Sequence, residues 1–170
     1  LNLARRDDGI KPEIGDVEPN FFNTTFTNYE MVAAENGKTF RFDNRIHRMI
    51  KTDKTLLKQL MTILFDNALK YTDEDGVIEL TISANDRTLF LKVADNGPGI
   101  STADKKKIFD RFYRVDKART RQTGGFGLGL SLAKQITEAL KGTITVKDNK
   151  PKGTIFEVKI AIRTDNRKKK

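Results

Sequence analysis

Apolar residues recur along the chain at spacings that change several times from helical to strand-like. From Phe22 to Asn36 they return every three or four residues, which predicts a helix that stops at Asn36-Gly37. A second helix is expected from Asp53, a good N-cap residue, through KTLLKQLMTILFDNALKY. A third is expected in GLGLSLAKQITEALKG, whose periodic Leu and Ile residues end at Gly142.

Strict alternation of apolar and polar residues predicts strands between these helices. It occurs near residues 40–42, 78–82 and 89–93, and in a closing hairpin over residues 144–146 and 156–162. Helical and strand-like segments therefore alternate along the chain. We expect an α/β fold, a two-layer sandwich in which one mixed β-sheet is covered on one face by about three helices.

The composition suits one folded domain and limits the available chemistry. The chain has 170 residues, of which 37% are apolar and 32% charged, with no cysteine and one histidine. Disulfides, thiolate metal sites and multi-histidine metal sites are therefore excluded. There is no stretch of eighteen apolar residues and no signal-peptide pattern, so we expect a soluble chain. Its start at LNLARRDDG predicts a fragment of a longer protein.

The net charge of +9 comes from two segments. Residues 101–122 carry eight Lys or Arg against three Asp, and residues 163–170 carry five against one. The rest of the chain is balanced. A basic nucleic-acid-binding domain remains an alternative, but this clustering favours one charged loop and one solvated tail.

Polar residues interrupt the apolar stripe of the second helix near its end. Asn67 lies on that stripe, and Lys70 and Tyr71 follow three and four residues later, so the three side chains project from one side. They offer a neutral oxygen ligand, a cation and an aromatic face, a set that suits a nucleoside triphosphate with Mg²⁺. The alternative is that Asn67 bridges a loop and Lys70 is solvated.

A second motif, DNGPGI, follows a strand that ends at Asp95. A carboxylate at this position is either a turn former or a site for recognising a base. An ionised Asp only accepts hydrogen bonds, so it can take one from the adenine amine and would reject guanine. Gly97 and Gly99 would let the backbone bend closely past a flat ring.

The third motif, TGGFGLGLSLAK, opens the third helix with glycines spaced as G-x-G-x-G. Unobstructed N–H groups and the positive end of the helix dipole would favour phosphate there. A flexible loop with close helix packing is the alternative. The spacing matches neither the dinucleotide fingerprint nor the P-loop.

In this order, D-N-A-x-K-Y, D-N-G-P-G-I, I-F-x-R-F-Y-R and G-x-G-L-G-L resemble the N box, first glycine box, F box and second glycine box of bacterial sensor histidine kinases. The likeness covers roughly residues 20–162 and implies the Bergerat sandwich of the GHKL superfamily. It also implies an ATP-binding catalytic domain over residues 21–162. Residues 1–20 have little periodicity and are expected to be a linker from the end of the preceding dimerisation helix, and residues 163–170 are expected to be a basic tail. A mobile ATP lid would span about residues 101–125.

The resemblance implies a role for each matching residue. Asn67 would be the Mg²⁺ ligand, and Asn67, Lys70 and Arg114 would act in catalysis, with Arg114 meeting the charge of the transferred phosphoryl group. Asp95 would read the adenine amine. The other residues implied to bind the nucleotide are Tyr71, Gly97, Gly99, Ile100, Lys117, Gly125, Gly127, Leu128 and Gly129. Phe109 and Phe112 would anchor the lid to the core.

Two features depart from the family pattern. Ile63 stands where these kinases often carry a further Asn and where the hydrolytic relatives carry a Glu that activates water, so we expect poor intrinsic ATP hydrolysis. A phosphoacceptor motif like H-E-x-x-T-P is absent. The single histidine, His47, is expected on a strand face rather than as the acceptor.

The implied function is that of a domain that binds ATP and Mg²⁺ and phosphorylates a His on its own dimerisation helices, which are missing here. A response-regulator Asp would then receive the phosphoryl group. The domain would be the cytoplasmic part of a membrane-anchored sensor, reaching the membrane only through missing segments and binding no nucleic acid. A GHKL protein-serine kinase of the anti-sigma type and a module that only binds ATP remain alternatives.

Overall fold

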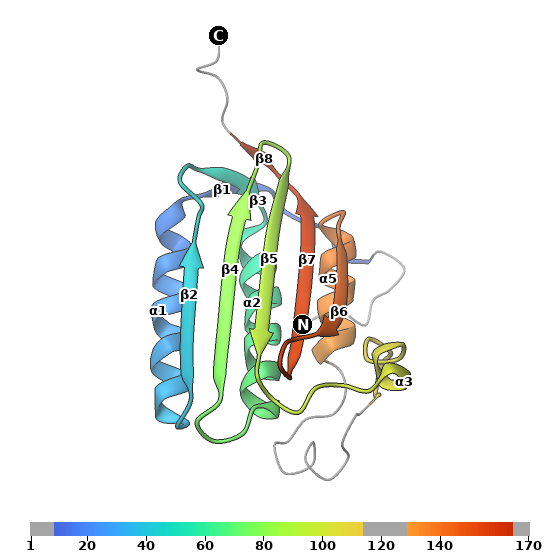
Figure 1. Ribbon diagram of the computed structural model, residues 1–170. Helices are drawn as coiled ribbons and strands as arrows, with labels where there is room; N and C mark the ends of the chain where they lie inside the picture. The colour runs from blue at the N-terminus through green and yellow to red at the C-terminus, as the bar shows by residue number, and fades with distance from the viewer. Residues whose placement is uncertain (1–8, 114–128, 165–170) are drawn as a thin grey trace.

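The computed structural model describes residues 9–113 and 129–164. Figure 1 shows a sheet in one layer and helices in the other. In chain order the elements are β1 (Gly15–Val17), α1 (Pro19–Glu35), β2 (Thr39–Asn44), β3 (Ile50–Thr52), α2 (Lys54–Tyr71), β4 (Val77–Ala84), β5 (Thr88–Asp95), α3 (Thr102–Lys105), α5 (Gly129–Ala139), β6 (Thr143–Asp148), β7 (Thr154–Ala161) and β8 (Arg163–Thr164). None of the helices described here combines the length and the apolar character needed to span a membrane.

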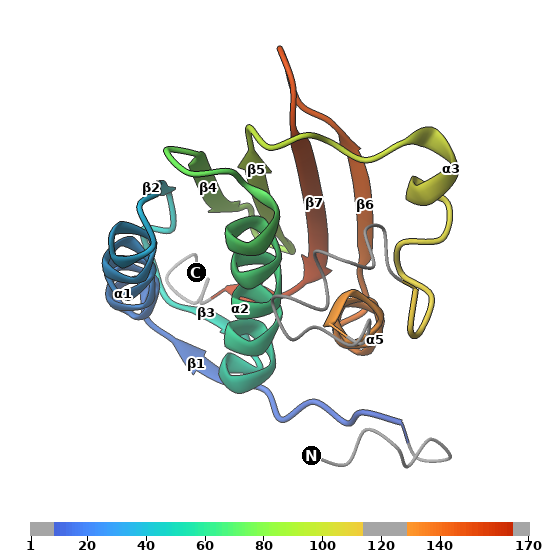
Figure 2. The ribbon, with the colours of Figure 1, turned by 90° about the horizontal axis from the view of Figure 1, so that it is seen from below.

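Within the described residues, the larger sheet has five strands in the order β2-β4-β5-β7-β6. β2 runs parallel to β4, whereas the other neighbouring pairs are antiparallel, so the sheet is mixed. Figure 2 shows α1, α2 and α5 together on one face of this sheet. The predicted two-layer sandwich is therefore confirmed.

The sequence does not predict the second, smaller sheet. In the described ranges it contains β1, β3 and β8, joined in that order by antiparallel pairing. β1 lies within residues 1–20, where a linker is expected, and β8 lies within residues 163–170, where a tail is expected. Strands of two or three residues are too short for alternation to reveal them. The predicted domain limits, residues 21 and 162, stay a prediction. In this sheet β1 lies before the first limit and β8 lies after the second.

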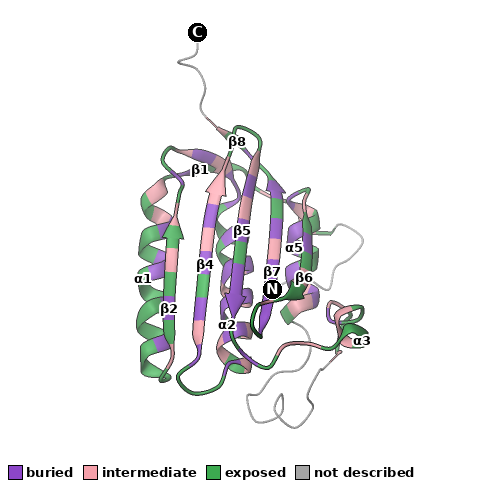
Figure 3. Cartoon of the chain, viewed as in Figure 1, coloured by how far each residue is buried: buried purple, intermediate pink, exposed green. Residues whose placement is uncertain are grey.

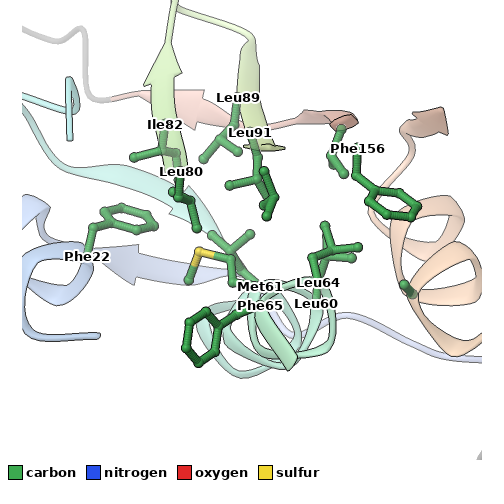
Figure 4. Close-up of a cluster of buried hydrophobic side chains, with 14 of the residues drawn as sticks. Phe22, Leu60, Met61, Leu64, Phe65, Leu80, Ile82, Leu89, Leu91 and Phe156 are labelled. Atoms are coloured by element: carbon green, nitrogen blue, oxygen red, sulfur yellow. The ribbon is translucent and has the colours of Figure 1, made fainter. Parts of the chain in front are cut away.

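The hydrophobic core lies between the larger sheet and the helices. The side chains labelled in Figure 4 belong to it: Phe22, Leu60, Met61, Leu64, Phe65, Leu80, Ile82, Leu89, Leu91 and Phe156. Figure 3 shows exposed residues on the outer side of α1 and buried residues along the central strands. Burying each large apolar side chain contributes roughly 1.5–3 kcal/mol. This packing holds α2 firmly against the middle of the sheet.

The buried face of α2 is rotated slightly from the predicted stripe. The residues it buries are Leu57, Leu60, Met61, Leu64, Phe65 and Ala68. Leu56, Ile63, Asn67 and Tyr71 are instead half-buried along one flank. Helix α5 packs beside α2 (Figure 2), so this flank of α2 also carries apolar residues. In the sequence these residues cannot be told apart from those of the buried face. Asn67 therefore lies beside the core and not within it.

His47 is exposed in the connection between β2 and β3, so the predicted strand-face position is wrong. β2 ends at Asn44, whose side-chain oxygen accepts the N–H of Ile46 at 2.9 Å. This local hydrogen bond turns the chain out of the sheet before His47 is reached.

Asp53 ties the incoming chain to the start of α2. Its Oδ1 accepts the N–H of Leu56 at 2.9 Å as the helix cap, and its Oδ2 accepts the N–H of Glu13 at 2.7 Å. We expect Asp53→Ala to lower the free energy of unfolding by about 2–3 kcal/mol, because the cap and the second hydrogen bond are both lost. Asp53→Ser keeps a capping oxygen and should cost only about 1 kcal/mol. Urea unfolding followed by circular dichroism measures both values, and equal losses would contradict the two separate roles.

Candidate active site

Three elements that carry the sequence motifs meet at one end of the molecule. α2 and β5 end there and α5 begins there, as Figure 1 shows. In Figure 2, which views that end, α2 and α5 lie side by side under the sheet. The N box, the first glycine box and the start of the α5 helix are therefore neighbours in space.

Gly97 brings the first glycine box against the end of α2. A Cβ atom at this position would lie 2.6 Å from the carbonyl oxygen of Tyr71 and 3.4 Å from Cα of Thr72. Any other side chain would collide with the backbone, so the loop can pass here only as glycine. The predicted proximity of DNGPGI to the N box has this contact as its structural basis.

Gly129, the first residue of α5, lies against the same flank of α2. A Cβ atom at Gly129 would be 3.6 Å from Cγ2 of Ile63, which is ordinary van der Waals contact. Ile63, Asn67 and Tyr71 are spaced by four residues and so share one side of the helix. Asn67 therefore lies between the contact with Gly129 and the contact with Gly97. It is half-buried there.

Asp95 ends β5 and is only 6% exposed. Its Oδ1 accepts the N–H of Gly97 at 2.8 Å. Burial raises the pKa of this carboxyl above its ordinary value, and the backbone N–H groups of Gly97 and Thr154 oppose that rise. The result is a hydrogen-bond acceptor with a fixed orientation beside the end of α2.

Thr154 is a candidate site residue that the sequence does not reveal. It begins β7, is 5% exposed and lies directly opposite Asp95 in the antiparallel ladder. Side chains that are directly opposite on neighbouring strands project from the same face of the sheet about 5 Å apart. A threonine at the start of a strand looks like an ordinary β former, and only the register of β5 with β7 places it beside Asp95.

The end of α2 carries both predicted polar neighbours of Asn67. Lys70 is exposed in the last turn, and Tyr71 is half-buried as its final residue. Partial burial raises the pKa of the Asp66 carboxyl, and the charge of Lys70 opposes this rise. A cation and an aromatic residue therefore follow Asn67 in the last turn of α2.

The remainder of the first glycine box leads from Asp95 to α3. Gly99 has a φ of +86°, in the left-handed region that favours glycine. Ile100 is partly buried against the core. Lys105 Nζ donates to the Ile100 carbonyl oxygen at 2.7 Å and lies 2.7 Å from Oδ1 of Asp148. This bridge connects α3 to the far end of the glycine loop.

Of the two phenylalanines of the F box, only one packs against the hydrophobic core. The ring of Phe109 lies 6.1 Å from the ring of Phe156, edge to face, and joins the lid base to the core. Phe112 is 62% exposed, and its nearby partner is the guanidinium of Arg111, 5.2 Å from the ring centre. The predicted anchoring role is therefore confirmed for Phe109 and is wrong for Phe112. The spacing F-x-x-F puts the two rings on different sides of a turn that is not a continuous helix.

Part of the predicted site lies outside the described ranges, namely Arg114, Lys117, Gly125, Gly127 and Leu128. Among the residues that are described, no group of three or more His, Cys, Asp or Glu side chains is arranged to hold a metal ion. The half-buried amide of Asn67, placed between two glycine contacts, fits a Mg²⁺ ion that takes its other ligands from phosphates and water.

The chain was compared with known proteins. A sequence model of the histidine kinase-, DNA gyrase B- and HSP90-like ATPases matches residues 52–164. The chain is 78% identical over 170 residues to the sensor protein CiaH of Streptococcus pneumoniae serotype 4, covering 100% of this chain and 38% of CiaH. Identity to the sensor histidine kinase WalK of Bacillus subtilis is 37% over 136 residues, covering 79% of this chain and 22% of WalK.

Solved structures agree with these matches. Full-length ShkA in complex with AMPPNP superposes with a TM-score of 0.76 at 26% identity, covering 92% of this chain and 33% of ShkA. The nucleotide-free catalytic domain of the histidine kinase ThkA gives a TM-score of 0.73 at 25% identity, covering 88% of this chain and 97% of that domain. The chain belongs to the histidine kinase-, DNA gyrase B- and HSP90-like ATPase family, as the ATP-binding catalytic domain of a sensor histidine kinase.

Proposed function

We propose that this domain binds ATP with Mg²⁺ at the end of α2 and transfers the γ-phosphoryl group to a histidine on separate dimerisation helices. A response-regulator aspartate would then receive it. The observation that carries the proposal is the position of Asn67, between the contact of Ile63 with Gly129 and the contact of Tyr71 with Gly97. The proposed metal ligand therefore lies on α2 between the residues that are next to the two glycine boxes.

The base of the nucleotide binds at the C-terminal end of the central strand β5. Asp95 accepts a hydrogen bond from the adenine amine, and the Thr154 hydroxyl lies beside that carboxylate. Gly97 holds the loop against the end of α2, Gly99 lets the loop turn, and Ile100 gives an apolar contact for the flat ring. Tyr71 packs against the nucleotide from the end of α2.

The phosphates lie between α2 and the start of α5. Asn67 holds Mg²⁺, which when bound offsets the negative charge of the phosphate oxygens. Lys70 adds a positive charge, and the N–H groups at the start of α5 point toward the anion from Gly129 onward. The remaining phosphate-binding residues that we propose are Arg114, Lys117, Gly125, Gly127 and Leu128.

Ile63 favours transfer over hydrolysis. Its side chain contacts Gly129 on the flank that carries Asn67, one helical turn away. A carboxylate there would be placed to activate water, whereas an isoleucine has no group that accepts a proton. Phosphoryl transfer depends mainly on positioning and charge stabilisation, so it does not need that base.

Properties of the relatives support the proposed partners. CiaH is a sensor protein, and this chain spans 38% of its length. We propose that the acceptor histidine and a membrane anchor belong to other segments of the full-length kinase. ThkA has been crystallised in complex with the response regulator TrrA. We infer a cytoplasmic kinase domain that works with a response regulator.

Calorimetric titration of the domain with ATP and GTP, with and without Mg²⁺, tests the site. We expect ATP to bind more tightly than GTP and Mg²⁺ to increase the affinity, because adenine and phosphates are recognised at separate ends of the pocket. Equal affinity for both nucleotides and no effect of Mg²⁺ would contradict the proposal. Salt-sensitive DNA binding that is lost on removal of residues 163–170 would instead support the nucleic-acid alternative.

The acceptor is tested by adding the dimerisation helices of the parent kinase and radiolabelled ATP. Phosphohistidine is labile in acid and stable in base, whereas phosphoserine is stable in acid. Acid-labile label on the helices is the expected result. Acid-stable label on a protein serine would support the anti-sigma type of kinase, and ATP binding without transfer would support a module that only binds ATP.

A further inference from the structure

The turn between β6 and β7 lies against the residue proposed to read adenine. Residues 149–153 connect the two strands, and β7 pairs with β5 so that Thr154 is opposite Asp95. In Figure 1 this turn is at the same end of the sheet as the end of β5. The sequence gives no reason to connect DNKPKG with DNGPGI, which lies about fifty residues earlier.

Asn149 in this turn makes a hydrogen bond to the main chain of Asp95. Its Nδ2 donates to the Asp95 carbonyl oxygen at 2.8 Å. A further bond fixes the orientation of the Asn149 side-chain amide, because its Oδ1 accepts the N–H of Lys150 at 2.8 Å. The backbone N–H of Asn149 donates to the Gly153 carbonyl oxygen at 3.0 Å and closes the turn. The donor is therefore held in place and not merely within reach.

Gly153 lets the turn approach this closely. Its φ is +116°, and a Cβ atom there would lie 1.9 Å from the Asp95 carbonyl oxygen and 2.8 Å from Cα of Asn96. On the opposite side, β4 holds the next residue, because Val77 N–H donates to the Asn96 side-chain oxygen at 2.9 Å. The peptide that follows Asp95 is thus fixed from both neighbouring strands.

The start of the same turn also holds the far end of the glycine loop. Asp148, the last residue of β6, pairs with Lys105, which donates to the Ile100 carbonyl oxygen. Between these two attachments a hollow of about 330 Å³ separates the loop from the turn, with Pro98 on one side and Pro151 on the other. Within the loop Gly99 also approaches the turn, because a Cβ atom there would lie 3.5 Å from the Gly153 carbonyl oxygen, so the turn positions the loop at several points.

We propose that Asn149 is a positioning residue for purine selection, which holds the main chain of Asp95 so that its carboxylate faces the adenine amine. This inference rests on the proposed function of Asp95. A small rotation of the Asp95 peptide would turn the carboxylate away from the base, because its own bond to Gly97 moves with the same segment. The phosphate end of the site, on α2 and α5, makes no use of Asn149.

The test compares ATP with inosine triphosphate, which carries a carbonyl oxygen where adenine carries the amine. Asn149→Asp has the same shape and keeps the acceptor for Lys150, but it cannot donate to Asp95 when ionised. The measured ratio is the dissociation constant for inosine triphosphate divided by that for ATP, determined by calorimetry with Mg²⁺. We expect this ratio to fall by about five- to tenfold, the effect of losing one hydrogen bond. Lys150→Ala, in the same turn with its backbone N–H intact, is the matched control and should leave the ratio unchanged.

The possible outcomes separate this proposal from the proposed function. A parent domain that does not prefer ATP to inosine triphosphate refutes the role of Asp95, and with it this inference. A parent that does discriminate, with an unchanged ratio in Asn149→Asp, overturns the role of Asn149 alone. Equal weakening of both nucleotides, or the same change in Lys150→Ala, also overturns it, because a general disturbance of the turn would have that effect.

A double substitution gives a further check. If Asn149 acts through Asp95, adding Asn149→Asp to Asp95→Asn should not reduce the ratio further. An additive effect would mean that Asn149 acts elsewhere. Should Asn149→Asp fail to fold in a thermal unfolding scan, Asn149→Ser is measured by the same criteria, since its shorter side chain cannot span the distance to Asp95.

Discussion

Replacing Asn67 with alanine is expected to abolish the Mg²⁺-dependent part of ATP affinity and to slow phosphoryl transfer by about 100- to 1,000-fold, the range for removing one group that stabilises transition-state charge. The amide oxygen is the neutral ligand that α2 places between the two glycine contacts. Adenine recognition at Asp95 should persist, because it depends on the end of β5 and not on the amide of Asn67. ATP titrations at several Mg²⁺ concentrations, together with transfer to added dimerisation helices, measure both effects.

Two neighbouring substitutions control this prediction. Asn67→Asp keeps an oxygen ligand and should retain Mg²⁺-dependent binding. Asp66→Asn changes the preceding residue of the same helix, which is only partly buried, and should leave the Mg²⁺ dependence unchanged. A loss in Asp66→Asn equal to the loss in Asn67→Ala would show that a carboxylate holds the metal and would overturn the assignment of Asn67.

The helices and the five-stranded sheet were predictable because their signals are local and repeated. Helix α2 spans five turns of apolar spacing with a strong cap at Asp53, and β4, β5 and β7 are each eight residues long with a run of alternating apolar residues. The short strands β1, β3 and β8 have no such repeat, and their pairing joins segments that are distant in the sequence. Their order could not be deduced from the sequence.

In the site, too, the residues in local motifs were predictable and those placed by distant pairing were not. Asn67, Asp95 and Gly97 could be identified because each lies in a compact motif whose residue types suggest a chemical role. Thr154 and Asn149 could not, because their importance arises from the register of β5 with β7 and from the close approach of Gly153. The exposure of Phe112 was missed for a related reason, because the motif does not reveal the left-handed backbone conformation at that residue, with a φ of +64°.

Replacing Asp95 with asparagine is expected to remove the preference for ATP over GTP. The variant can still accept the N–H of Gly97 through its remaining oxygen, so the loop should keep its conformation. Its amide NH₂ group would however meet the adenine amine donor to donor. We expect ATP affinity to fall by about 10- to 100-fold, the effect of losing a hydrogen bond to a charged group, while GTP affinity changes little. Calorimetric titration measures both, and an unchanged ATP preference would contradict the role of Asp95.

The same substitution should stabilise the domain in the absence of nucleotide, and the pH dependence reveals why. Burial raises the pKa of Asp95, so the folded chain binds a proton here more readily than the unfolded chain does. The contribution of Asp95 to stability is therefore greatest in acid and is lost as pH rises through the raised pKa. The amide introduced by Asp95→Asn does not titrate, so the advantage of the variant over the parent should be larger at neutral than at mildly acidic pH in urea unfolding. A larger advantage of the variant at mildly acidic pH would mean that a cation stabilises the Asp95 carboxylate in the folded domain. Burying this charge would then carry no cost for adenine recognition.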